Sequence, residues 1–165
     1  MLNAVYQESD DALKSHTTIL DRVFLSCNQP IRTILLMDDH RLVLRALHTY
    51  LEKRGYNLLE ALNGEEALLL AERFPETIHV LVTDLVMARM NGGELARRLV
   101  PLRPDMQVIM MSGCPDEIMA QQELTPQIPM LQKPFQPMRL LLAIEDVLAN
   151  PQPQRNVASI ARPGR

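Results

Sequence analysis

Five short apolar runs alternate along this chain with segments of helical period, and this alternation restricts the fold more than any other feature. The runs lie at Ile31–Met37, Asn57–Ala61, Ile78–Thr83, Gln107–Met111 and Ile128–Gln132. Strands that alternate with helices favour parallel pairing, with helices covering both faces of the sheet. The sequence therefore predicts an α/β fold built on a doubly wound, five-stranded parallel sheet.

The expected helices carry recognisable start and stop signals. The segment Arg41–Arg54 places leucines at helical spacing, and Gly55 follows where a C′ residue belongs. Glu66 stands three residues after a capping asparagine, as in a capping box. Two asparagines are expected to cap helix starts: Asn63, and Asn91 ahead of the helix Leu95–Leu102. Two prolines, Pro115 and Pro137, suit the first turn of a helix.

Composition excludes several classes of protein. With 165 residues, 47% of them apolar, the chain can bury one good core and is too short for two comfortable domains. A net charge of -3 argues against a broad nucleic-acid-binding surface.

Cys27 and Cys114 form no C-x-x-C pair, so reduced thiols are expected rather than a disulfide framework. Ile19–Leu25 is interrupted by Asp21 and Arg22, and no stretch approaches the roughly 20 apolar residues of a membrane span. We expect a soluble, cytoplasmic protein that binds neither nucleic acid nor membrane.

The α/β pattern occupies residues 31–149, and two flanks of different composition surround it. Residues 1–30 hold a candidate amphipathic helix, with Tyr6, Leu13 and Leu20 seven apart. The sequence leaves open whether this segment forms a homodimer. Residues 150–165 are rich in Pro, Gln, Asn and Arg and poor in large apolar side chains, so a disordered tail is expected.

Polar residues follow four of the five predicted strands. Asp38 and Asp39 come after the first strand, Asp84 after the third, Ser112 after the fourth and Lys133 after the fifth. Parallel sheets of this kind bind ligands beyond the carboxyl ends of their strands. We therefore expect these side chains to meet at one edge of the sheet.

The expected cluster combines three carboxylates, a hydroxyl and an ammonium group. Carboxylates that lie together repel one another, and Mg²⁺ relieves this because it prefers oxygen ligands. Lys133 adds a compact positive charge suited to a phosphoryl oxygen. A carboxylate nucleophile beside a metal and a cation fits phosphoryl transfer to Asp84, which would give an acyl phosphate.

The ordered set of motifs resembles the receiver domains of two-component response regulators, from about Ile31 to Ala149. The likeness rests on four elements: Asp38-Asp39, Asp84 with a loop close to D-x-x-M-P-x-M-[DN]-G, Ser112-Gly113, and Lys133-Pro134-Phe135. The phrases around Ser112 and Lys133 further resemble receivers fused to sensor histidine kinases. The resemblance implies a (βα)5 flavodoxin-like fold.

The resemblance also implies a metal site and a phosphoryl donor. Asp84 would accept its phosphoryl group from a phosphohistidine on a sensor histidine kinase or a histidine phosphotransfer protein. Asp39 and Asp84 would bind Mg²⁺ directly, Asp38 would act mainly through water, and the backbone carbonyl of Val86 would complete the protein ligands.

The two remaining site residues would handle the phosphoryl oxygens. By the same resemblance, Lys133 would pair with these oxygens, Ser112 would swing to hydrogen-bond one of them, and the bond to Pro134 would be cis. The chain departs from the family at two positions. Ala88 replaces the usual loop proline, and Met130 replaces a Tyr or Phe that turns inward on activation, which puts the usual readout in doubt.

The expected function is that of a phosphorylation-controlled binding module in two-component or phosphorelay signalling. Its own chemistry would be limited to self-phosphorylation on Asp84 and slow self-dephosphorylation, so it would not be an enzyme. One alternative is a degenerate receiver that serves as a constitutive interaction scaffold, which Met130 leaves open. Another is a Mg²⁺-dependent phosphohydrolase, which needs a second aspartate where this chain has Val86.

Overall fold

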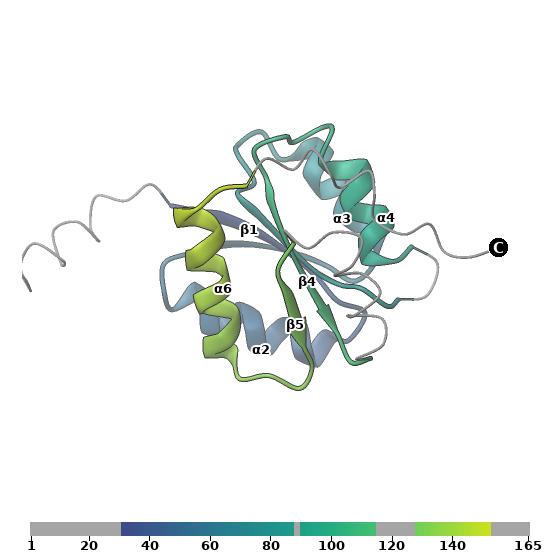
Figure 1. The fold of residues 1–165 in the computed structure, drawn as a ribbon. Helices are drawn as coiled ribbons and strands as arrows, with labels where there is room; N and C mark the ends of the chain where they lie inside the picture. The colour runs from purple at the N-terminus through teal and green to yellow at the C-terminus, as the bar shows by residue number, and fades with distance from the viewer. Residues whose placement is uncertain (1–30, 88–89, 115–127, 153–165) are drawn as a thin grey trace, which may run out of the picture. The chain divides into compact units, whose positions relative to one another are not determined.

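The computed structural model describes residues 31–87, 90–114 and 128–152. Within these ranges, five strands form one parallel sheet in the order β2-β1-β3-β4-β5 (Figure 1). They are β1 (Thr33–Met37), β2 (Asn57–Ala61), β3 (Val80–Asp84), β4 (Gln107–Ser112) and β5 (Met130–Gln132). The chain reaches one edge at β2 and then crosses β1 toward the other edge, which confirms the predicted doubly wound sheet.

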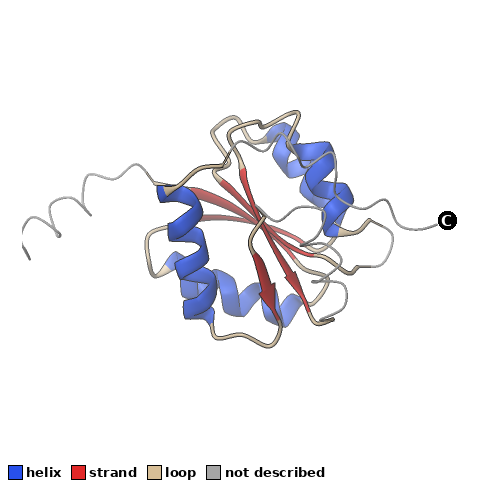
Figure 2. Ribbon diagram, in the orientation of Figure 1, coloured by secondary structure: helices blue, strands red, loops and turns tan. Residues whose placement is uncertain are grey.

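Helices cover both faces of this sheet. In the described ranges they are α2 (Arg41–Glu52), α3 (Gly64–Arg73), α4 (Gly92–Leu99) and α6 (Pro137–Ala149). Figure 2 shows the strands as one twisted layer, with α2 and α6 on one side and α3 and α4 on the other. None of these helices is long and apolar enough to cross a membrane. The helix expected at Pro115, the N-terminal segment and the tail from residue 153 lie outside the described residues.

The core consists of two apolar layers, one on each face of the sheet. Along β1, Ile34 and Leu36 belong to the layer under α2 and α6, while Leu35 and Met37 belong to the layer under α3 and α4. Successive side chains of a strand point to opposite faces, so a central strand covered on both sides must be apolar throughout. The unbroken apolar runs seen in the sequence are the consequence.

Three strands begin later than their apolar runs predict, and one of them is β3, which begins at Val80 rather than at Ile78. β1 begins at Thr33, and Ile31 is 72% exposed, so apolarity alone placed the strand start too early. β5 begins at Met130 rather than at Ile128. Pro129 has no backbone N–H to donate to a ladder, which delays the start of this strand.

Two helices also end earlier than expected. α2 ends at Glu52 with Lys53 as its C-cap, so Gly55, which adopts the left-handed conformation with a φ of 86°, lies one position beyond the C′ site of the observed helix rather than at it. α4 begins at Gly92 and ends at Leu99. Val100 keeps helical dihedral angles, but Pro101 lacks an N–H and cannot donate the next intrahelical hydrogen bond, so the predicted extension to residue 102 fails.

The predicted capping residues do cap their helices. The Asn63 side-chain oxygen accepts a hydrogen bond from Glu66 N at 2.9 Å, and that of Asn91 accepts one from Glu94 N at 2.8 Å. The Glu66 carboxylate accepts from the backbone N–H of Leu62 at 2.8 Å. These bonds satisfy N–H groups that helix starts leave without an intrahelical partner, and they fix where α3 and α4 begin.

His79 joins the starts of β1 and β3. Its Nδ1 accepts a hydrogen bond from Thr33 N at 3.0 Å, and its own backbone N–H donates to the Thr33 carbonyl at 2.8 Å. Burial, followed by the positive charge of Arg32, holds the pKa of His79 below its usual value, although its backbone hydrogen bonds act in the opposite direction. The folded protein therefore favours the neutral ring.

We expect the free energy of unfolding to fall as the pH drops below about 6.5, the ordinary pKa of histidine. Below that pH the unfolded chain binds a proton at His79 that the folded chain resists. The stabilisation is complete above the unfolded-state pKa and is lost as the pH falls through the folded-state value. Urea unfolding measures the free energy of unfolding at about pH 7.5 and at about pH 5.5. The loss of this free energy between the two pH values should be smaller for His79→Asn than for the wild type. An equal difference would contradict this role.

Candidate functional site

The strand registers bring the predicted site residues to one edge of the sheet. Met37 pairs with Thr83, so Asp38 lies at the end of β1 beside Asp84 at the end of β3. Asp84 itself pairs with Met111, which places Ser112 one residue beyond it on the adjacent strand. β3 and β4 each run one residue past their predicted ends and so include Asp84 and Ser112.

Lys133 bridges the two buried carboxylates. Its Nζ lies 2.6 Å from Asp38 Oδ2 and 2.6 Å from Asp84 Oδ2. Asp38 is completely buried and Asp84 is 7% exposed. Buried carboxylates are costly unless they are paired and hydrogen-bonded, and one ammonium group here serves both.

The ammonium group of Lys133 stays charged over a wider pH range than usual. Its burial lowers the pKa, but the hydrogen bonds and negative charges of Asp38 and Asp84 outweigh burial and raise the pKa of Lys133 above its ordinary value. The site therefore carries a fixed cation whose proton is not available for acid–base exchange near neutral pH.

Asp39 and His40 form the exposed rim of the site. His40 Nδ1 lies 2.7 Å from Asp39 Oδ1, and the His40 backbone N–H donates to Asp38 Oδ1 at 2.9 Å. One ligand atom from each of Asp38, Asp39 and His40 lies within 4.8 Å of the others, close enough to hold a metal ion. Asp84 is joined to this group through Lys133.

The donor set fits a hard divalent cation. The site holds three carboxylates and one ammonium group, which leaves two negative charges for another cation to neutralise. Carboxylate oxygens are the ligands that Mg²⁺ prefers, and it is commonly held by one or two of them together with water. The residues present therefore suit the magnesium ion expected from the sequence.

The loop after Asp84 is held close against the end of β3. The Val86 backbone N–H donates to Asp84 Oδ1 at 3.2 Å, and Gly92 N donates to the Leu85 carbonyl at 3.3 Å. A Cβ atom at Gly92 would lie 2.2 Å from the Asp84 carbonyl oxygen and 2.7 Å from Thr83 Oγ1. Only glycine lets the start of α4 approach β3 this closely.

Ser112 is buried at the end of β4, next to the segment that carries Lys133. Its Oγ accepts a hydrogen bond from Cys114 N at 3.1 Å, and its carbonyl accepts from Lys133 N at 2.7 Å. The Lys133–Pro134 bond is cis, as expected. Met130, three residues earlier, is partly buried against the core under α3 and α4.

Sequence reasoning missed three contributors to this site. His40 directly follows the acidic pair, and that adjacency was the available signal for its contact with Asp39. Thr83 and Gly92 contribute by packing closely against each other and against the backbone of Asp84. Packing of this kind depends on how α4 approaches β3, which strand and helix periodicity do not determine.

Comparison with known proteins decides the family. The response regulator receiver domain family matches residues 34–145. The chain belongs to the response regulator receiver domain family. The sequence prediction of a receiver is thereby confirmed, and the strand order seen here is the framework on which its site residues lie.

Individual relatives agree with this assignment. The sensor kinase CckA of Brucella abortus (strain 2308) is 32% identical over 117 residues, which are 70% of this chain and 12% of that kinase. The response regulator receiver protein CpdR of the same strain is 38% identical over 84 residues, which are 50% of this chain and 68% of CpdR. The crystal structure of the receiver domain from the hybrid histidine kinase CckA matches with a TM-score of 0.60 and 28% identity, and covers 70% of this chain and 98% of that domain. The expected likeness to receivers of hybrid kinases is confirmed.

Proposed function

We propose that this receiver accepts a phosphoryl group on Asp84 from a phosphohistidine of a sensor histidine kinase or a histidine phosphotransfer protein. The observation that carries the proposal is the Lys133 ammonium group, 2.6 Å from one carboxylate oxygen of Asp38 and 2.6 Å from one of Asp84. A carboxylate nucleophile beside a fixed cation suits a reaction in which negative charge spreads over phosphoryl oxygens.

In the proposed transfer, a carboxylate oxygen of Asp84 attacks the phosphorus atom. The new P–O bond forms as the P–N bond to the partner imidazole breaks, and the bonding electrons leave with the imidazole nitrogen. Lys133 keeps its proton and pairs with the phosphoryl oxygens. The Ser112 hydroxyl donates a hydrogen bond to one of these oxygens once the group is in place.

Mg²⁺ completes the proposed site. Asp39 and Asp84 would hold it directly, Asp38 would act through water, and Val86 would contribute its backbone carbonyl. The ion would neutralise negative charge on the phosphoryl group. Lys133, which contacts Asp38 and Asp84, would pair with the phosphoryl oxygens.

We expect Asp39→Asn to weaken Mg²⁺ binding by about tenfold or more, because one direct carboxylate ligand becomes a neutral amide. Isothermal titration calorimetry on wild type and variant measures this difference. Asp105→Asn makes the same chemical change at an exposed loop position and serves as the matched control. Equal affinities for all three proteins would remove Asp39 from the metal site.

The output we propose is a change in protein–protein contacts in the cytoplasm. Receiver domains are signalling domains, and the chemistry proposed for this one is self-phosphorylation and slow self-dephosphorylation. The methionine at position 130 is flexible and lacks the two defined orientations of an aromatic ring, so we do not assign the readout to it. The downstream partner is a protein that distinguishes the phosphorylated from the unphosphorylated state.

A constitutive scaffold is the first rival function, and beryllofluoride tests it. This anion mimics a phosphoryl group and does not hydrolyse, so it reports a competent site even when a phosphoryl adduct is short-lived. We expect a ¹⁹F resonance of bound beryllofluoride that needs Mg²⁺, with amide shifts at Asp84, Ser112 and Lys133. A spectrum that contains only free beryllofluoride would favour the scaffold.

The second rival is a turning-over phosphohydrolase. Such an enzyme needs an acid–base carboxylate two residues after its nucleophile, and the half-exposed Val86 side chain has no titratable group. We expect no more than one phosphate released per Asp84 within minutes from p-nitrophenyl phosphate with Mg²⁺. Sustained release that Asp84→Asn abolishes would favour the hydrolase.

A further inference from the structure

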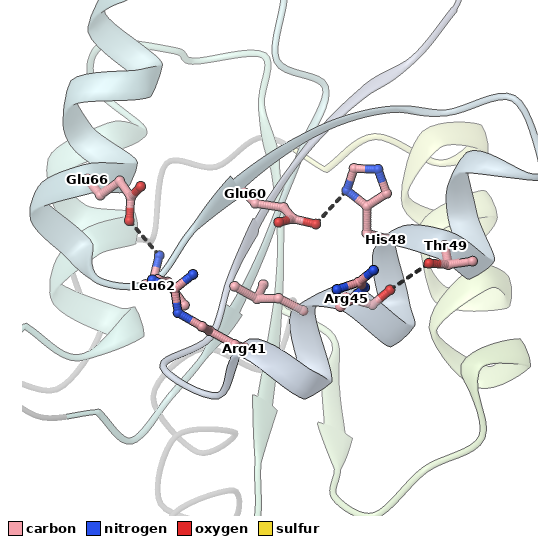
Figure 3. Close-up of a pocket in the computed structure, with 8 residues that line it drawn as sticks. Arg41, Arg45, His48, Thr49, Glu60, Leu62 and Glu66 are labelled. Atoms are coloured by element: carbon pink, nitrogen blue, oxygen red, sulfur yellow. Dashed lines mark hydrogen bonds and ion pairs between the residues drawn. The ribbon is translucent and has the colours of Figure 1, made fainter.

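A pocket lies on the β2 edge of the sheet, and none of the residues that line it belongs to the Lys133 bridge. It has a volume of about 540 Å³ and is bounded by α2, the end of β2 and the start of α3. Figure 3 shows Arg41, Arg45 and His48 along one side of α2, with Glu60 on β2 and Glu66 on α3 around the pocket. Ligand pockets of small molecules fall in this range of size.

The acidic groups of this pocket are already occupied by partners within the protein. Glu60 Oε1 lies 2.5 Å from His48 Nδ1, in an ion-pair contact rather than an aligned hydrogen bond. Glu66 Oε2 accepts from the backbone N–H of Leu62 at 2.8 Å. One oxygen of each carboxylate is therefore engaged within the protein, which fixes the position of both side chains.

The two arginines of the pocket, unlike its carboxylates, have side chains without a partner among the described residues. Arg41 and Arg45 lie one turn apart on α2 and face the same pocket (Figure 3). In the part of the chain that the structure describes, neither guanidinium group has a hydrogen bond or an ion pair with another residue. Each guanidinium carries five N–H donors in a planar fork that matches a carboxylate or a phosphate. Donors thus outnumber free acceptors in the pocket.

The remaining walls determine what kind of anion fits. Leu44 is buried beneath the arginines, and Leu62 lies across from them at the end of β2. The volume exceeds that of a single small ion, so an organic body can pack against the partly exposed Leu62 while its charged group meets the guanidinium groups.

We propose that this pocket binds a small organic oxyanion, through a carboxylate or phosphate group paired with Arg41 and Arg45. The site is separate from the acidic cluster at Asp38, Asp39 and Asp84, which by its charge attracts a cation. Because α2 begins directly after that cluster, an occupied pocket would lie next to the phosphoacceptor edge of the sheet without including any of its ligands.

NMR of the arginine Nε–Hε groups tests the proposal, because it observes the guanidinium groups of Arg41 and Arg45 directly. The full chain is titrated with inorganic phosphate, pyrophosphate and citrate in metal-free buffer, with ionic strength held constant by sodium chloride. We expect saturable shifts of the Arg41 and Arg45 signals, with the organic or larger anions binding more tightly than phosphate. Citrate and pyrophosphate separate carboxylate recognition from phosphate recognition.

Variants then assign the binding to the two forks. Arg41→Gln and Arg45→Gln should each weaken binding by about tenfold or more, the loss expected for a charge-assisted hydrogen bond. Arg45→Lys keeps the charge but removes the fork, and an intermediate loss is expected. Arg139→Gln removes an exposed arginine on α6 and should change nothing. All four substitutions are at partly or fully exposed positions, and unchanged backbone spectra verify that the variants fold.

Three results would overturn the proposal. They are the absence of saturable shifts with any of the three anions, shifts of equal size at Arg139, and unchanged affinity in both glutamine variants. The outcome does not depend on phosphorylation of Asp84, so it neither supports nor weakens the function proposed above.

Discussion

Replacing Asp84 with asparagine is expected to abolish phosphoryl uptake, with a loss of rate of at least about a thousandfold. The amide keeps the size of the side chain but removes the nucleophilic oxygen anion, so no P–O bond can form. It also removes one of the two carboxylates that hold Lys133. The donor for this test is phosphoramidate, whose P–N bond resembles that of phosphohistidine, and the readout is the growth of a phosphoryl adduct by intact mass.

The control for this variant is again Asp105→Asn, which removes a carboxylate far from the site and should phosphorylate at the wild-type rate. Beryllofluoride binding provides a second comparison, because it too requires the Asp84 carboxylate. If Asp84→Asn still gained a phosphoryl group at the wild-type rate, another residue would be the acceptor and the assignment of Asp84 would be wrong.

Replacing Gly92 with alanine should destabilise the protein by about 2–3 kcal/mol, the range for overpacking a filled interior. The new Cβ would lie 2.2 Å from the Asp84 carbonyl oxygen and 2.9 Å from Thr83 Cγ2. The Asp84 oxygen belongs to the backbone of β3, which cannot move without disturbing the side chain of Asp84. Urea unfolding should therefore show lower stability, and phosphorylation of the surviving folded protein should be slower.

Two other glycines separate this steric effect from the ordinary cost of adding a methyl group. Gly113 has open space around it and no positive φ, so Gly113→Ala should be nearly neutral. Gly55 also has open space but a φ of 86°, so Gly55→Ala should cost about 1 kcal/mol through backbone strain alone. Equal losses for all three variants would show that close packing of α4 on β3 is not what Gly92 provides.

Much of the fold could be predicted from the periodicity of apolar residues, because this periodicity reflects which positions are buried. The strands β1, β3 and β4 are covered on both faces, and their unbroken apolar runs identified them. Their ends were harder to place. Ile31 is as apolar as Ile34 yet lies exposed, since strand pairing rather than hydrophobicity decides where β1 begins.

The gathering of the site residues at one edge of the sheet was also predictable from the sequence, but for a different reason. Parallel strands bring their carboxyl ends to one edge, so residues that follow those strands gather there whatever their spacing in the chain. That rule placed Asp38, Asp84 and Lys133 together. It could not predict that Lys133 bridges both carboxylates, or that His40 contacts Asp39, because side-chain directions depend on the loops that follow each strand.

Intact mass after incubation with acetyl phosphate shows whether Asp84 accepts a phosphoryl group. The wild-type chain is compared with and without Mg²⁺. We predict a single phosphoryl adduct that forms only in the presence of Mg²⁺. No adduct under these conditions, together with no beryllofluoride complex, would contradict phosphorylation of Asp84 and leave the chain as a scaffold with an inactive receiver site.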